Sequence, residues 1–188
     1  MATRYWTNGA GTGVISTASN WTPSGAPSAG DTLIFATAPT GATSTAIVGG
    51  NYLSLGDMAE VRIGTGFDAA FGSSSSYVVM EASSVILESG ADVFLDVECA
   101  GASDKVVVGS TPFGADSLHI RGDINELRIL DAIGDVAVES TTTCSTSSGY
   151  TEVDTMFVFS RSEPTVTIET AVASMDELNV EGGSVECS

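Results

Sequence analysis

Apolar residues along this chain alternate with polar ones or gather in runs of four to six, and many of them are β-branched. Gly, Asp, Asn and Ser separate these runs, which is the pattern of short strands joined by turns rather than of helices. We therefore expect an all-β protein. The predicted strands span residues 32–35, 60–63, 77–80, 84–87, 93–97, 105–108, 117–120, 126–129, 136–139, 156–159, 165–168 and 177–180.

An internal repeat indicates how these strands are arranged. The heptapeptide at 57–63, DMAEVRI, recurs as DINELRI at 123–129 and as SMDELNV at 174–180. The starts lie 66 and 51 residues apart, which divides into three and two coils of roughly 22–25 residues, a solenoid spacing. Stacked coils bury equivalent apolar positions, and the Glu and Arg columns are expected outside as ladders of alternating charge. The predicted core positions are Met58, Val61, Ile63, Ile124, Leu127, Ile129, Met175, Leu178 and Val180.

The segment 20–35 combines an aromatic anchor, Trp21, with closely spaced Gly and Pro residues, a Gly30-Asp31 turn and an apolar strand that ends at Phe35. It resembles the opening segment of right-handed parallel β-helix proteins, found in bacterial surface proteins and in structural proteins of tailed phages. The resemblance implies a right-handed parallel β-helix, with Trp21 and Phe35 as candidates for the N-terminal cap. We expect an N-terminal arm at 1–19 and a single solenoid domain at 20–188. A β-sandwich or jelly roll has similar strands and is the alternative fold.

Charge and composition exclude several classes of partner. The chain carries 24 acidic and 6 basic residues, a net charge of −18, so nucleic acid and anionic membrane surfaces are poor partners. We see no signal peptide and no stretch of about 20 apolar residues that would span a membrane. Three cysteines, Cys99, Cys144 and Cys187, lack metal-ligand spacing and predict no disulfide framework, which fits assembly in a reducing cytoplasm.

Few residues suggest chemistry. His119 is the sole histidine, and it alternates outward if Leu118 and Ile120 point inward. Asp123 and Glu126, with Arg121 and Arg128, form the nearest approach to a polysaccharide-cleaving cluster, although we expect few exposed aromatic residues after residue 35 to stack on a sugar. The Arg121-Gly122-Asp123 tripeptide is interpreted as a turn, and Cys99 as a loop thiol. We therefore expect no enzyme activity, no cofactor and no metal.

Three functions remain open: a phage capsid decoration (cement) protein, a receptor-binding or adhesin-like module, and a polysaccharide-active enzyme. A short acidic solenoid whose C-terminal strand looks uncapped favours the first, which would be assembled in the host cytoplasm and displayed on the capsid exterior. The resemblance implies a homotrimer bound to the major capsid protein. Arg4, Tyr5 and Trp6 are the candidate capsid contacts, because Arg and aromatic residues dominate interface energies. The alternative is a frayed terminus with Trp6 folded onto its own core.

Overall fold

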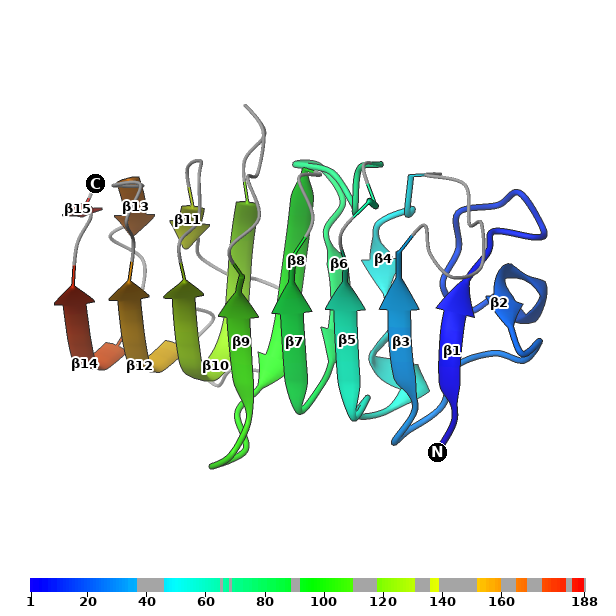
Figure 1. Ribbon diagram of the computed structural model, residues 1–188, viewed down its shortest axis with the longest axis horizontal. Coiled ribbons are helices and arrows are strands. Elements are labelled where there is room, and N and C mark those ends of the chain that lie inside the picture. The colour runs from blue at the N-terminus through cyan, green and yellow to red at the C-terminus, as the bar shows by residue number, and fades with distance from the viewer. Residues whose placement is uncertain are drawn as a thin grey trace.

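The protein is a parallel β-solenoid, as Figure 1 shows for the computed structural model. The structure describes residues 1–36, 46–64, 66–67, 69–88, 92–109, 118–130, 136–138, 152–159, 165–168, 174–181 and 184–187, and from residue 129 onward the description concerns the backbone. Within these ranges nearly all regular structure is strand, with two short 3₁₀ turns, η1 (Ala18–Asn20) and η2 (Leu53–Leu55). The all-β parallel β-helix predicted from the sequence is confirmed, and the antiparallel sandwich is excluded.

One face of the solenoid, the first sheet, runs the length of the molecule. Its strands pair in parallel from one coil to the next. In chain order they are β1 (Thr3–Trp6), β3 (Thr32–Phe35), β5 (Glu60–Ile63), β7 (Ser84–Leu87), β9 (Lys105–Val108), the C-terminal part of β10 (Leu118–Leu130), β12 (Glu152–Phe159) and β14 (Ser174–Glu181).

The second sheet forms another face and shares β10 with the first. It contains β4 (Gly50–Asn51), β6 (Val78–Glu81), β8 (Val93–Cys99), the N-terminal part of β10, β11 (Val136–Val138), β13 (Thr165–Ile168) and β15 (Ser184–Cys187). The first part of β10 pairs with β8, and its last part pairs with β9. Gly122 lies between them at φ 131°, and a Cβ there would overlap the carbonyl oxygen of Val97. Only glycine therefore fits where this strand passes from one sheet to the other.

The internal repeat is in register. Val61, Leu127 and Leu178, equivalent positions of the three heptapeptides, belong to one column of strand partners that also includes Val85, Val106 and Met156. Consecutive members of this column are 24, 21, 21, 29 and 22 residues apart, so three coils separate the first two copies and two coils separate the next pair. The number of coils between the repeats was thus correctly predicted, although their lengths vary more than expected.

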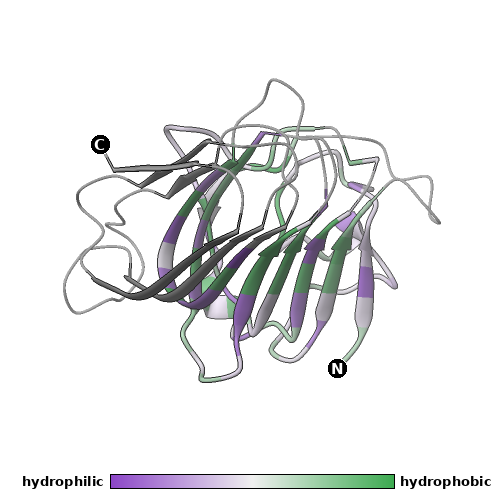
Figure 2. Ribbon diagram, turned by 60° about the vertical axis from the view of Figure 1, so that its left-hand side comes forward, coloured by the Kyte–Doolittle hydropathy of each residue, from purple (hydrophilic) through white to green (hydrophobic). Residues whose placement is uncertain are grey.

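Inward-facing residues fill the interior. Figure 2 shows hydrophobic and hydrophilic positions alternating along the strands of the first sheet. Of the predicted core residues, Met58, Val61, Ile63, Ile124 and Leu127 are buried, each with at most 1% of its surface exposed. Full burial of such side chains stabilises the fold by about 1.5–3 kcal/mol each. The side chains of Ile129, Met175, Leu178 and Val180 lie outside the described residues.

The strand predictions differ from the structure around Gly122 and at several short strands. The strands expected at 117–120 and 126–129 are one strand, β10, because Gly122 bends the chain without interrupting its pairing. The turn interpretation of Arg121-Gly122-Asp123 was therefore wrong. The pattern also missed four short strands, β1, β2 (Trp21–Thr22), β4 and β15.

Candidate functional site

An aromatic cluster closes the N-terminal end of the solenoid. Trp6, Trp21 and Phe35 have ring centroids 5.1–5.6 Å apart, and each is at most 2% exposed. Strand β2, which bears Trp21, pairs antiparallel with β1 and so covers the outer edge of the parallel stack. The Trp21 indole Nε1 donates to the carbonyl oxygen of Ile15 at 2.7 Å. The two cap candidates, Trp21 and Phe35, thus lie together at this end.

Buried polar side chains fix the same closure. Asn20 is fully buried: its Oδ1 accepts from the Ala10 amide at 2.8 Å, and its Nδ2 donates to Thr12 Oγ1 and to the Val14 carbonyl oxygen, both at 2.9 Å. Asp31, 1% exposed, accepts from Arg4 Nε and from the Ala2 amide, both at 2.6 Å. Most of the polar requirements of these buried groups are therefore met by the first 14 residues.

The expected N-terminal arm is consequently part of the fold. Strand β1 is hydrogen-bonded to both β2 and β3, so the prediction of a separate arm at 1–19 was wrong. Of the three candidate capsid contacts, Trp6 is fully buried and Arg4 is held against Asp31 with 14% of its side chain exposed. The alternative combined a frayed terminus with Trp6 folded onto the core: the burial of Trp6 is confirmed, whereas the terminus forms the paired strand β1. Only Tyr5 of the three lies partly exposed in the outward-facing register of the first sheet.

Tyr5 begins a column of strand partners on the outer face of the first sheet, which we call the outer column. Its members combine partly exposed apolar and aromatic side chains with two arginines. They are Tyr5, Ile34, Arg62, Ile86, Val107 and Arg128. The parallel column two residues earlier is polar: Thr3, Thr32, Glu60, Ser84, Lys105 and Glu126. The outer face of the first sheet thus carries a column of apolar, aromatic and arginine side chains beside a polar column.

Charges on this face pair mostly along single strands, with one contact between neighbouring coils. Arg62 Nε lies 3.2 Å from Glu60 Oε1 and Arg128 Nε lies 2.7 Å from Glu126 Oε1, while Arg62 Nη1 lies 3.5 Å from Oε2 of Glu88, the residue after β7. The predicted continuous ladder of alternating charge is not formed, because Ile86 and Val107 separate the two arginines. The proposed catalytic cluster is divided as well. Arg128 binds Glu126, whereas Arg121, on the other side of the Gly122 bend, binds Asp96 at 2.9 Å.

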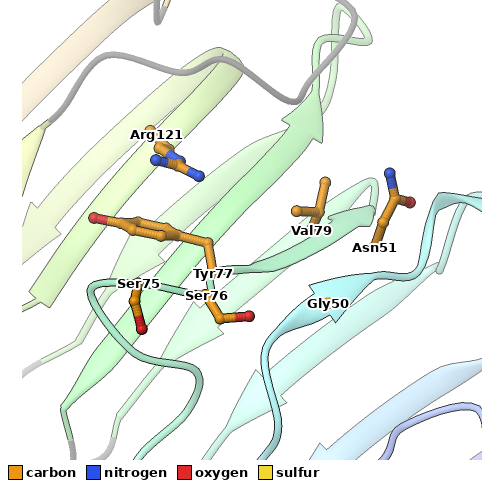
Figure 3. Close-up of a pocket in the computed structure, with 7 residues that line it drawn as sticks. All are labelled: Gly50, Asn51, Ser75, Ser76, Tyr77, Val79 and Arg121. Carbon is orange, nitrogen blue, oxygen red and sulfur yellow. The ribbon is translucent and has the colours of Figure 1, made fainter.

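A pocket of about 230 Å³ lies on the second sheet, and its lining residues come from β4, β6, β10 and the turn that holds Ser75 and Ser76 (Figure 3). Asn51, Val79, Asp96 and Arg121 are consecutive members of one column of strand partners. The Arg121 guanidinium carbon lies 3.5 Å from the centroid of the Tyr77 ring, and Asp96 beneath it is fully buried. The pocket is lined by Gly50, Asn51, Ser75, Ser76, Tyr77, Val79 and Arg121.

Beside this pocket three rings follow one another across successive coils. The Tyr77 and Phe94 centroids are 5.6 Å apart with the planes at 83°, and Phe94 stacks on His119 at 4.5 Å and 8°. Leu118 and Ile120 are buried while His119 is partly exposed, so its outward orientation was predicted correctly. The sequence did not reveal this ring column, because its members are 17 and 25 residues apart in the chain.

Cys99 and the carboxylates near it do not form a reactive site. Cys99 ends β8 and is fully buried, so its assignment to a loop was wrong. Burial, together with the charges of Asp104 and Asp57, raises the pKa of its thiol to about 12, which leaves almost no thiolate at neutral pH. Burial also raises the pKa of Glu81, helped by the charge of Glu98. Cys144 and the Cys187 side chain lie outside the described residues.

The described part of the chain contains no group of three or more His, Cys, Asp and Glu side chains placed to hold a metal ion. Over the same residues, no helix has the length and apolarity to span a bilayer. No protein family, curated protein or solved structure matches the chain.

Proposed function

We propose that this chain is a structural protein of a tailed-phage virion, which binds the outer surface of the capsid as a homotrimer and stabilises the shell. The observation that carries the proposal is the outer column, whose apolar residues lie on a hydrogen-bonded sheet. Protein interfaces combine an apolar, aromatic and Arg-rich centre with a polar rim. The outer column supplies the apolar, aromatic and Arg-rich centre, and the adjoining polar column supplies the polar rim.

The structure also supports the resemblance on which the phage assignment rests. The residues of segment 20–35 that carry the resemblance form the closure of a parallel β-helix, with Asn20, Trp21, Asp31 and Phe35 all buried. Each of them packs or hydrogen-bonds within that closure, as expected if the segment is the first coil of such a fold. The net charge of −18 suits display outside a particle, because it keeps the protein away from packaged DNA and opposes random association of copies.

The mechanism of stabilisation would be mechanical. A rigid face that contacts neighbouring capsid subunits at once resists their separation under internal DNA pressure. If the contact forms only on the expanded shell, binding favours that state by mass action. Tyr5, Ile86 and Val107 would provide the apolar centre of the contact, and Arg62 would provide its charged hydrogen bonds.

The experiment places a charge in the centre of this face. Ile86→Lys should abolish cosedimentation with shells assembled from the major capsid protein of the same source, because an unpaired ammonium would be buried in the contact. The matched control is Val48→Lys, an equivalent exchange at a valine that is 49% exposed and lies outside the outer column. Circular dichroism should show the same β-sheet content for both variants and the unaltered protein.

The result separates the remaining functions. Retention of shell binding by Ile86→Lys would contradict the assignment of this face, and failure of the unaltered protein to bind any shell would contradict the proposal itself. Light scattering on the same samples tests the oligomeric state, since a monomer at micromolar concentration would contradict the proposed homotrimer. Attachment to host cells without attachment to shells would favour the receptor-binding alternative.

A further inference from the structure

The pocket on the second sheet shares no residue with the outer column, so it is separate from the proposed capsid contact. Its most distinctive feature is the way Arg121 is held. Asp96, fully buried, accepts a hydrogen bond from Arg121 Nε at 2.9 Å, and the guanidinium carbon lies 3.5 Å from the centroid of the Tyr77 ring. Ion pairing and the cation–π contact together fix the orientation of the guanidinium with 18% of the side chain exposed.

This arrangement leaves the terminal amino groups of Arg121 able to bind a ligand in the pocket. The contact with Asp96 uses Nε, and among the residues that the structure describes the two terminal amino groups of Arg121 meet no acceptor. A planar guanidinium matches the two oxygens of a carboxylate, and such charge-assisted hydrogen bonds are among the strongest available to a protein. A pre-oriented Arg at the wall of a pocket is therefore suited to a carboxylate ligand.

The rest of the lining is suited to a sugar. Asn51, Ser75 and Ser76 are exposed and offer amide and hydroxyl groups that both donate and accept, as the hydroxyls of a saccharide require. Val79 adds an apolar surface for the carbon side of a ring. A volume of about 230 Å³ lies below the ~300–1,000 Å³ of sites for drug-sized ligands, so the pocket is matched to one ring rather than to a chain of them.

We propose that this pocket, lined by Arg121, Tyr77, Asn51 and the Ser75-Ser76 turn, binds one carboxylate-bearing ring of an acidic saccharide. Arg121 binds the carboxylate, and the serine and asparagine side chains bind ring hydroxyls. No covalent step is involved. The site gives the protein an affinity for acidic glycans that is separate from any contact with a shell.

The experiment measures saturable binding of glucuronate, galacturonate and N-acetylneuraminate by NMR titration. Glucose serves as the uncharged ring, and acetate serves as the carboxylate without a ring. We expect at least one acidic sugar to bind with a Kd of roughly 0.1–10 mM. It should bind at least about tenfold more tightly than glucose or acetate, since each lacks one of the two recognised features.

Two variants test the location. Ser75→Trp should fill the pocket and abolish binding, whereas Ser54→Trp, the same exchange at an exposed serine of η2, should not. The double variant Asp96→Asn/Arg121→Gln removes both charges without burying one alone, and should weaken acidic-sugar binding at least about tenfold while the circular dichroism is unchanged. Ser75→Trp should still bind shells, which separates this site from the capsid-binding face.

Several outcomes would overturn the inference. Acetate binding as tightly as the acidic sugars would reduce the site to a simple anion site, and equal binding of glucose would remove the role of Arg121. Unchanged binding by Ser75→Trp would place the sugar elsewhere. Absence of saturable binding by all three acidic sugars would reject the proposal outright.

Discussion

Two arginine–aspartate pairs in this molecule share a design but differ in how the arginine is used. In the N-terminal closure, Arg4 donates from Nε to Asp31; on the second sheet, Arg121 donates from Nε to Asp96. Both aspartates are buried, and the arginine side chains are similarly exposed, 14% and 18%. Arg4 Nη1, however, also donates to the carbonyl oxygens of Pro23 and Gly25 at 3.2 Å, whereas the end of the Arg121 side chain borders the pocket.

The difference separates a structural arginine from a binding arginine. Arg4 joins three parts of the chain, β1, the 23–25 turn and the start of β3, and its hydrogen-bonding capacity is used within the fold. Arg121 is oriented by one carboxylate and one ring, and its remaining capacity faces a ligand-sized space. Two arginines with similar burial and the same kind of aspartate partner can therefore have different roles. The role of each depends on what the terminal amino groups of its guanidinium contact.

Asp31→Ala, which breaks the N-terminal pair, should cause the largest loss of stability among the proposed variants. It leaves Arg4 without its carboxylate and removes the acceptor of the Ala2 amide, so the free energy of unfolding should fall by about 3–5 kcal/mol. Urea denaturation followed by tryptophan fluorescence measures this, because Trp6 and Trp21 lie in the same closure. Asp57→Ala, at an exposed aspartate, should change stability by no more than about 1 kcal/mol. Equal losses in the two variants would show that the closure does not depend on this pair.

Exchanging the two arginines for glutamine tests the comparison directly. Arg4→Gln loses the contact with Asp31 and two hydrogen bonds to backbone carbonyls, so it should cost about 1–3 kcal/mol more than Arg121→Gln. The order should reverse in the sugar titration, where Arg121→Gln loses affinity and Arg4→Gln does not. Both readouts come from the same purified variants. The comparison fails if Arg121→Gln is the less stable protein and still binds the sugar.

These two pairs also show what the sequence could predict. The closure is built largely from residues close together in the chain, so the pattern of segment 20–35 predicted that Trp21 and Phe35 lie in the N-terminal cap. The repeat gave the stacking of Val61 on Leu127 and Leu178 because their spacing is a multiple of one coil. The pocket draws on coils whose lengths differ, and its register depends on loops that no periodicity fixes. Asp96 therefore could not be matched with Arg121 from the sequence, nor Phe94 with His119.

Stability at acid pH should depend on two carboxyl groups in opposite directions. Burial alone would raise the pKa of Asp31, but its hydrogen bonds with Arg4, Ala2 and Ser28, and the charge of Arg4, hold the pKa below 3.8. Its contribution is complete above pH 3.8 and is lost as the pH falls through the folded-state pKa. Burial and the charges of Glu98, Asp57 and Asp104 instead raise the pKa of Glu81 above 4.5, so its penalty grows as the pH rises from 4.5 toward the folded-state value.

Substitutions at these two positions should separate the effects. Asp31→Asn should weaken the loss of stability below pH 3.8, whereas Glu81→Gln should stabilise the protein near neutral pH and have little effect below pH 4.5. Thermal unfolding followed by circular dichroism from pH 2.5 to 7.5 measures both. A Glu81→Gln protein that is no more stable than the unaltered one at pH 7 would contradict the account of that carboxyl group.

Arg128→Ala should cause the smallest loss of stability among these variants, because its ion pair is exposed on the surface. Its side chain makes a two-point contact, from Nε to Glu126 Oε1 at 2.7 Å and from Nη2 to Oε2 at 3.1 Å, which raises the pKa of Arg128. The geometry is as good as that of the two buried pairs, but 45% of the Arg128 side chain and 23% of the Glu126 side chain remain exposed. Water therefore solvates both charges before and after the contact forms, and the loss should be below about 1 kcal/mol.

The adjacent substitution Leu127→Ala provides the contrast, because Leu127 is fully buried in the interior column and its truncation should cost about 2–5 kcal/mol. The two residues differ by one position in β10 and hence by the face on which they lie. Urea denaturation at low and high salt compares them: the small Arg128 effect should shrink with salt, and the Leu127 effect should not. Similar losses for the two variants would mean that the outer column already contributes to the core of the isolated protein. That result would also weaken the case for the first sheet as a binding face, since such a face must be separable from the interior that supports it.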